Sequence, residues 1–229
     1  MKHGKKYRSI EEKIDGAKEY ELAEAIELIR ANAGAKFDES VEVHVKLGIN
    51  PKKTDEQVRA TVVLPHGTGR GKRVAVVTES AAKEAETAGA VLVGGEELIA
   101  GIKEGKIIPG SAFDILLATP DMMSKLASVA KILGPKGLMP SPKNETITAK
   151  IAEGVEMLGK GKKASFKNDD GGNVHQVIGK LSFDASALLE NYAALLETLS
   201  RLKPEGLKGK FVKSIVIAST MGPGVRVKV

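Results

Sequence analysis

A glycine cluster in the first half of the chain has the composition of a phosphate-binding loop. Residues 67–72, Gly-Thr-Gly-Arg-Gly-Lys, combine flexible backbone with basic side chains. The spacing does not fit, because a Walker loop has four residues between its first glycine and its Gly-Lys-Ser/Thr end, and a dinucleotide fingerprint opens a helix. Here a strand-like run follows. Gly94-Gly95 does follow a strand and open a helix, but two glycines more often form a tight turn.

Residues that could support catalysis or metal binding are scattered. The four histidines, at positions 3, 44, 66 and 175, have no metal-ligand spacing, and the absence of cysteine excludes thiolate zinc sites and disulfides. Asp114 and Asp121 lie around the carboxyl end of an apolar strand, where α/β sheets place functional groups, yet Asp121 is also explained by a helix start. No nucleophile elbow and no acid/base pair is visible. The sequence therefore predicts neither an enzyme nor a cofactor.

Two other stretches have residue types suited to contact with a partner. Residues 219–223, Ser-Thr-Met-Gly-Pro, end a β-branched run with a small polar pair and a flexible thioether before a Gly-Pro break. Earlier in the chain, Lys36 and Phe37 stand at the mouth of an outward polar row within residues 40–44. The simpler alternatives are a tight turn and a phenylalanine that covers the end of a sheet. The residue pattern alone leaves both alternatives open.

The charge distribution indicates which kind of partner to expect. The 229 residues have a formal net charge of +6, and residues 160–229 hold 12 basic and 6 acidic side chains, whereas the rest of the chain is balanced. A basic final third suits a phosphate-rich partner, and a solvated basic face is the alternative. Because only 3% of residues are aromatic, an RNA duplex or junction read by shape fits better than a single strand held by base stacking.

Nothing in the sequence indicates a membrane or a secreted protein. No apolar run approaches the length needed to cross a bilayer, and the amino-terminal residues lack the apolar core of a signal peptide. The absence of cysteine is natural in a reducing compartment. We expect a cytoplasmic protein without a membrane partner.

The middle of the chain predicts an α/β domain. Short continuous apolar runs suit strands buried on both faces of a parallel sheet, and helical stretches alternate with them, which is the βαβ signature. The runs are 74–77, 90–93 and 115–118, and the helical stretches are 81–88, 96–103 and 120–133. Thr119 is expected to cap the third helix, with Pro120 in its first position.

The flanks predict an antiparallel α+β domain. Residues 41–47 alternate strictly, with valines and leucine inward, and residues 57–64 and 212–218 indicate further strands. Phe183-Asp184 begins a helix that Pro204 ends. Its apolar stripe is Leu188, Tyr192, Leu195, Leu199 and Leu202.

Neither flank alone offers a complete layer to cover its helix, so both are expected to fold together. Residues 1–67 with 160–229 then form one domain, and residues 68–159 are an inserted Rossmann-like domain. Glycine-rich joints connect the two, and glycine permits large backbone changes, so a hinge is expected, with ordinary exposed loops as the alternative. The hinge positions are Gly67, Gly69, Gly159 and Gly161.

Five motifs, in order, resemble the family of the first-numbered protein of the large ribosomal subunit, in its bacterial type. They are AKFDESVEVHVKLGIN, VRATVVLPHGTG, ILGPKGLMPSPK, FKNDDGGNVHQVIGKLSF and TMGPGVRV. The similarity runs from about the amino-terminal KHGKKYR to the last residue, and ILGPKGLMP together with TMGP is highly specific. The fold that this resemblance implies agrees with the fold predicted from the residue pattern. It is a split α+β domain from both termini with an inserted Rossmann-like domain on a hinge.

The resemblance implies a non-enzymatic function on the ribosome. Members of this family bind large-subunit ribosomal RNA at the mobile stalk, help to release deacylated tRNA from the exit site, and in bacteria repress translation of their own operon mRNA. The implied location is the cytoplasm and the ribosome, and off the ribosome we expect a monomer without a cofactor.

The resemblance also implies a joint RNA-contact surface from the turn near the carboxyl terminus and the strand that follows Phe37, adjoined by the basic loop at Lys167-Asn168. Thr220 would donate to a phosphate or 2′-hydroxyl, Met221 would pack on a sugar or base, and Gly222 would permit close approach. The full set is Lys36, Phe37, Ser40, Glu42, Lys46, Lys167, Asn168, Thr220, Met221 and Gly222.

Two alternative functions stay open at this stage. A nucleotide- or metabolite-binding enzyme has the βαβ pattern in its favour and lacks both the fingerprint and the catalytic pair. A general DNA-binding protein shares the basic final third, and salt-dependent binding would not exclude it, because phosphate contacts produce that dependence with either nucleic acid.

Overall fold

The computed structural model describes residues 4–53, 56–204, 207 and 209–229. The chain divides into two compact units, one formed by Met1–Gly69 with Ala164–Val229 and the other by Arg70–Lys163. Both crossings fall in the glycine-rich stretches at residues 65–71 and 159–163. Within the described residues, no helix combines the length and the apolar character needed to span a membrane.

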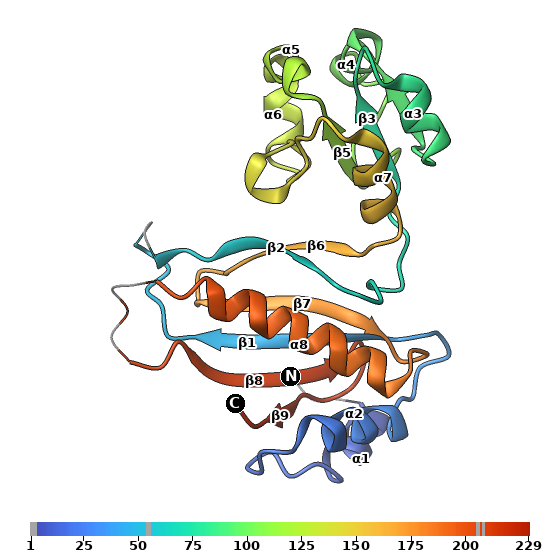
Figure 1. Cartoon of the computed structure of the whole chain (residues 1–229). Coiled ribbons are helices and arrows are strands. Elements are labelled where there is room, and N and C mark those ends of the chain that lie inside the picture. Colours follow the sequence, from blue (N-terminus) through green and yellow to red (C-terminus); the bar gives the residue numbers. More distant parts are fainter. Residues whose placement is uncertain (1–3, 54–55, 205–206, 208) are drawn as a thin grey trace. The chain divides into compact units, whose positions relative to one another are not determined.

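The first unit, the split unit, is an α+β domain built on an antiparallel sheet in the order β7-β1-β8-β9, with a separate two-stranded sheet β2-β6 (Figure 1). The strands are β1 Ser40–Leu47, β2 Arg59–Val63, β6 Lys163–Lys167, β7 Asn173–Lys180, β8 Val212–Ser219 and β9 Val225–Val227. The helices are α1 Lys5–Glu11, α2 Leu22–Ala31 and α8 Ala185–Arg201. This is the expected split α+β fold, assembled from both ends of the chain.

Strand β1 is the centre of the split unit because its residues alternate between the two faces of the sheet. Val41, Val43, Val45 and Leu47 are almost fully buried in one core with α2 and α8, and the residues between them are half-buried on the opposite face. Such alternation is expected when one face of an antiparallel sheet packs on a core and the other faces solvent. The predicted inward and outward assignments are therefore confirmed.

Helix α8 fastens the sheet from the core side. Its predicted stripe is buried at Leu188, Tyr192, Leu195 and Leu199, with Leu202 partly buried beyond the helix end. Asn191 is also fully buried, and its amide nitrogen donates to the carbonyls of Gly67 (2.9 Å) and Ile178 (2.7 Å). A buried amide needs such partners, since leaving it unpaired costs about 1–3 kcal/mol.

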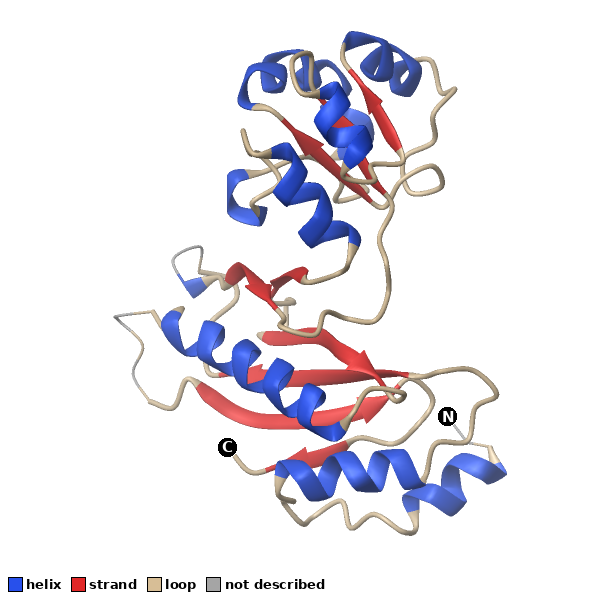
Figure 2. Cartoon of the chain, turned by 45° about the vertical axis from the view of Figure 1, so that its right-hand side comes forward, coloured by secondary structure: helices blue, strands red, loops and turns tan. Residues whose placement is uncertain are grey.

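The inserted unit has a parallel sheet in the order β4-β3-β5, with helices on both faces (Figure 2). Ala75 and Val77 of the central strand pack into one core, and Val74 and Val76 pack into the other. The strands are β3 Val74–Val77, β4 Leu92–Gly94 and β5 Ile115–Ala118, and the helices are α3 Ala82–Thr87, α4 Glu96–Lys103, α5 Met123–Leu126, α6 Ala130–Leu133 and α7 Ile151–Gly159. This is the predicted Rossmann-like arrangement.

The third predicted helix, over residues 120–133, is not continuous. Short 3₁₀ turns at Pro120–Met122 and Ala127–Val129 alternate with α5 and α6, and another 3₁₀ turn spans Pro142–Asn144. Thr119 stands in the expected capping position but makes no side-chain capping bond. Its side chain is buried instead.

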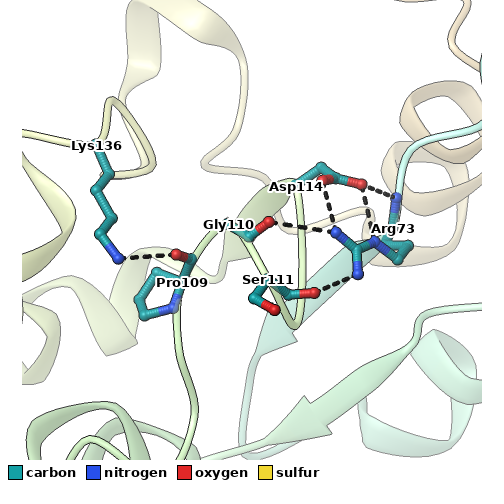
Figure 3. A network of polar contacts seen from close by, with 6 residues as sticks. All are labelled: Arg73, Pro109, Gly110, Ser111, Asp114 and Lys136. Atoms are coloured by element: carbon teal, nitrogen blue, oxygen red, sulfur yellow. Dashed lines mark hydrogen bonds and ion pairs between the residues drawn. The ribbon is translucent and has the colours of Figure 1, made fainter.

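A polar network lies at the amino-terminal ends of β3 and β5 (Figure 3). The Arg73 guanidinium binds both carboxylate oxygens of Asp114, at 3.1 and 2.9 Å, and also donates to the carbonyls of Gly110 and Ser111. This pair lowers the pKa of Asp114 to about 2. Asp114 immediately precedes β5, so it lies at the amino end of this strand and not around the carboxyl end, as was expected. Its carboxylate is bound to Arg73 in an ion pair.

Candidate functional site: a turn and strand surface in the split unit

The turn after β8 lies directly beside the start of β1. Ser40 and Thr220 exchange hydrogen bonds: the Thr220 amide donates to the Ser40 carbonyl at 3.1 Å, and the Ser40 amide donates to Thr220 Oγ1 at 2.9 Å. The antiparallel register, with Val41 opposite Ser219, produces this arrangement. We call Lys36, Phe37, Ser40, Thr220, Met221 and Gly222 the turn surface.

Glu39 holds the two segments of the turn surface together. Its carboxylate is almost fully buried and accepts the amide of Ala35 (3.1 Å) with one oxygen and the amide of Met221 (3.0 Å) with the other. Burial raises its pKa, and hydrogen bonds from Ser219 and from these amides outweigh that effect, so the pKa lies below its usual value. Glu39 is therefore an ionised residue that links the loop containing Lys36, called the Lys36 loop, to the turn after β8. We call this link the brace.

The brace leaves two large apolar side chains in solvent. Phe37 is 57% exposed and Met221 is 62% exposed. Phe37 therefore does not cover the end of the sheet, which was the simpler alternative. Gly222 is needed for a local reason, since a Cβ there would lie 2.5 Å from Ser219 Oγ.

Lys180 extends this surface across β7. Its ammonium donates to Ser40 Oγ at 2.9 Å and to the Asp38 carbonyl at 3.2 Å. Asp38 in turn accepts from the amide and hydroxyl of Ser182. The Ser40 hydroxyl accepts from Lys180 and keeps its own proton for another acceptor, such as a phosphate oxygen.

Glu42 and His44 continue the outward row along β1. His44 lies opposite His175 of β7, with 2.8 Å between the two Nδ1 atoms, and the rings meet edge to face. Burial lowers the pKa of His44, the nearby His175 lowers it further, and Glu42 raises it. One imidazole of this pair must donate and the other accept, so the pair is most stable when at least one ring is neutral.

The loop that was expected to adjoin the turn surface lies at the other end of β1. Lys46 pairs with Asn173 at the start of β7, whereas Ser40 pairs with Lys180 at its end. These positions are six residue steps apart along the strand, which corresponds to about 20 Å. Lys167 is exposed there on β6. The RNA set predicted from the resemblance thus forms two groups.

Polar side chains at the Lys46 end are bonded within the protein. Lys46 donates to the Gly171 carbonyl at 2.5 Å. Asn168 is buried; its Oδ1 accepts the Val58 amide at 2.8 Å, and its Nδ2 donates to the Asp169 carbonyl at 2.9 Å. Both ends of the Asn168 amide are thus occupied, which favours a structural role over direct RNA contact.

The glycines expected at the hinge occupy ordinary turn positions within their units. Gly67, Gly69 and Gly161 have φ of 68°, 72° and 66°, values that favour glycine, and Gly159 ends α7. Asn191 binds the Gly67 carbonyl, and a Cβ on Gly69 would approach Lys180 and Phe183. Both Gly67 and Gly69 are therefore anchored to the split unit. The hinge itself stays a prediction.

The carboxyl end of the parallel sheet, where α/β enzymes bind ligands, holds an ion-pair cluster. Lys125 contacts Glu79 at 2.6 Å and Glu96 at 2.7 Å, and these bonds raise the Lys125 pKa and lower that of Glu96. Two carboxylates there disfavour a phosphate-bearing ligand. Among the described residues, no three histidine, aspartate or glutamate side chains gather as a metal site. The place where an α/β enzyme would bind a nucleotide is thus occupied by paired charges in this unit.

The residues missed by sequence reasoning are Glu39 and Lys180. A signal for Glu39 was present, because the period of two that buries Val41 and Val43 also places residue 39 on the inward side. An acid in such a position needs hydrogen-bond donors. No comparable signal existed for Lys180, whose contact with Ser40 depends on strand pairing across 140 residues.

Comparison with known proteins gives consistent matches over nearly the whole chain. Residues 29–223 match the Ribosomal protein L1p/L10e family. The Large ribosomal subunit protein uL1 of Mycoplasma capricolum is 46% identical over 227 residues, covering 99% of both chains. The proteins of the same name from Kosmotoga olearia and Mesoplasma florum are 46% and 44% identical, covering 98% and 100% of this chain and 96% and 99% of their own lengths.

Proposed function

The chain belongs to the ribosomal protein L1p/L10e family, and from this premise we propose that it is a constituent of the large ribosomal subunit that binds large-subunit ribosomal RNA through the turn surface. The relatives named as large-subunit proteins align along the full chain, which supports the assignment to the ribosome. The RNA site is proposed in the stalk region, as the resemblance implies.

The observation that carries the proposed site is the exposure of Phe37 and Met221 on braced backbone. Large exposed apolar side chains that gather at one place are typical of binding sites, and Phe37 and Met221 line the same pocket. Thr220, Ser40 and Lys180 add hydroxyl and ammonium groups beside them, which are the usual partners of phosphate and 2′-hydroxyl oxygens. Glu42 would accept from a base amino group or a 2′-hydroxyl, because a carboxylate cannot bind phosphate favourably.

The two groups of predicted residues have different roles in this proposal. The turn surface makes the specific contacts, and Lys167 with Lys46 attracts the backbone of an RNA that spans the outward face of β1. Asn168 holds the end of β6, where Lys167 is exposed. Assistance in tRNA release and repression of the protein's own operon mRNA are part of the proposal and have only the sequence resemblance as support. The same holds for a cytoplasmic monomer off the ribosome and for a hinge between the units.

A competition experiment with the full chain tests the proposal. A labelled stalk-region fragment of large-subunit ribosomal RNA is displaced by unlabelled stalk RNA, duplex DNA or unrelated duplex RNA at about 0.2 M salt, where non-specific binding is weak. We expect only the stalk RNA to compete efficiently. Equal and weak competition by all three would leave a general nucleic-acid-binding protein in place of the proposed function.

A matched pair of variants locates the site. Met221→Ala is expected to weaken stalk-RNA binding, whereas Val91→Ala, which removes an apolar side chain of similar exposure from the inserted unit, is expected to have no effect. Loss of affinity in both variants, or in neither, would argue against the turn surface as the binding site.

A further inference from the structure

An open pocket of about 540 Å³ lies beside the turn surface, bounded by α1, by the loop after α2 and by the turn itself. Phe37 and Met221 line this pocket. Its volume is within the range of about 300–1,000 Å³ that is typical of small-molecule sites.

The pocket has an apolar wall and a polar wall. Tyr7 and Ile10 of α1, both half-buried, stand with Phe37 and Met221 as the apolar part. Asn32 supplies the polar part: its Nδ2 donates to the Leu28 carbonyl at 2.8 Å, which leaves the carbonyl oxygen of its side chain able to accept another donor. Flat apolar faces with a hydrogen-bonding edge are the features of a nucleobase.

The charge of the pocket also fits a nucleotide. Lys36 is the one charged side chain among the described residues that line it, and no carboxylate is among them. The two acids of this segment are both bonded within the protein: Glu39 accepts the amides of Ala35 and Met221, and the exposed Asp38 accepts from the amide and hydroxyl of Ser182. A phosphate that follows a bound base would therefore meet the Lys36 ammonium group at a pocket lined by no carboxylate.

We propose that this pocket accepts one unstacked nucleobase of the bound RNA, packed against the apolar wall that includes Tyr7, Phe37 and Met221, with its edge at Asn32. The inference rests on the proposed function and deepens it, since the turn surface then reads one base in addition to the RNA backbone. Extruding a base costs a few kcal/mol in a duplex and less in a loop or junction, so the base is expected to come from an unpaired position.

Filling the pocket without disturbing its walls tests the inference. Gly34 lines the pocket, and a Cβ added there would meet no heavy atom within 4 Å. Gly34→Leu should occlude the space, and Tyr7→Leu should remove an aromatic wall while keeping apolar bulk. Gly16→Leu is the matched control, because a Cβ on Gly16 also meets nothing within 4 Å and Gly16 lies outside the pocket.

The full-length variants are measured against stalk-region RNA fragments in which each unpaired nucleotide is replaced, one at a time, by an abasic residue. We expect one position at which removal of the base weakens wild-type binding about tenfold. At that position, removal of the base should have almost no effect on the binding of Gly34→Leu or Tyr7→Leu. Gly16→Leu should behave as wild type.

The possible failures are distinguishable. If the wild type binds stalk RNA but the pocket variants change the effect of base removal at no position, the pocket inference is overturned and the proposed function stays in place. Failure of the wild type to bind stalk RNA selectively would remove the proposed function, and the pocket inference with it.

Discussion

At the Ser40 end of β1, exposed apolar side chains stand on backbone that is held by hydrogen bonds, whereas at the Lys46 end the polar side chains of Lys46 and Asn168 are bonded within the protein. Glu39 takes up amides of the Lys36 loop and of the turn, and Phe37 and Met221 stay exposed. At the Lys46 end, the Lys46 ammonium donates to a backbone carbonyl. The Asn168 side chain accepts a backbone amide and donates to another carbonyl.

This difference is the basis on which we propose a binding surface at one end of the strand and a structural role at the other. A recognition surface needs groups whose best partner is outside the protein, on backbone whose own polar groups are already satisfied. Residue type does not separate the two cases. The partners of each side chain do, and they support the proposed binding at the turn surface and a structural role for Asn168.

The largest expected effect comes from Glu39→Gln. The substitution keeps the shape of the side chain but replaces one acceptor oxygen with an amide group that faces backbone N–H donors. We expect the free energy of unfolding to fall by about 3 kcal/mol, because hydrogen bonds to a charged acceptor contribute about 1.5–3 kcal/mol each. Urea unfolding measures this change.

The same variant tests whether the brace matters for function. We expect stalk-RNA affinity to fall at least tenfold under conditions where the variant is fully folded, because the Lys36 loop and the turn lose their common anchor. Glu27→Gln on the exposed side of α2 is the control for loss of one negative charge. Normal RNA affinity in folded Glu39→Gln would separate the brace from the binding site.

A neighbouring pair at the other end of β1 should give the opposite pattern. Asn168→Ala removes two hydrogen bonds and leaves the Val58 amide without its acceptor, so we expect the free energy of unfolding to fall by about 2 kcal/mol. RNA affinity of the folded protein should change less than twofold. Lys167→Ala should lower affinity and its dependence on salt without changing stability. A large loss of affinity in folded Asn168→Ala would return Asn168 to the RNA contacts.

The architecture was predictable because it depends on periodicities that are local in sequence. The alternation of residues 41–47 defined the faces of β1, and short apolar runs at Val74–Val77 and Ile115–Ala118 defined the parallel sheet. The broken segment at 120–133 was not predictable in detail, since an apolar pattern does not separate one helix from consecutive short turns.

The candidate site was predictable only in part, because proximity along a motif differs from proximity in the fold. Ser40 and Thr220 were expected together and are in direct contact. Lys167-Asn168 was expected beside them, but the β1–β7 register places that loop about 20 Å away. Strand register is a long-range property, and one sequence without its pairing partners does not reveal it.

Thr220→Val is expected to have an intermediate effect. Its hydroxyl accepts the Ser40 amide at 2.9 Å, so the substitution removes this bond as well as any donation to RNA. We expect RNA binding to weaken by about 1–2 kcal/mol, which is roughly five- to thirtyfold. Thr220→Ser should restore most of the affinity, because the hydroxyl is kept. If Val and Ser variants bind equally well, the hydroxyl has no part in the contact.

The smallest effect on stability is expected for Asp169→Asn. This effect should depend on pH, which distinguishes it from those of the other variants. Asp169 accepts hydrogen bonds from the backbone and side chain of Asn173, from His175 and from the Gly171 amide, and these lower its pKa to about 2. A carboxyl whose pKa is lower in the folded protein than in the unfolded chain stabilises the fold above the unfolded pKa, near 3.8. That contribution declines as the pH falls toward 2.

Wild type should therefore have a slightly higher Tm than Asp169→Asn at pH 6, and the difference should shrink between pH 4 and about 2. Because Asp169 is exposed at the Lys46 end of β1, away from the turn surface, RNA affinity at neutral pH should hardly change. Thermal unfolding of both proteins across this pH range measures the first effect, and stalk-RNA titration measures the second. A Tm difference that stays constant with pH would mean that the Asp169 charge does not stabilise the loop, whereas a large change in RNA affinity would show that this end of β1 recognises RNA as directly as the turn surface does.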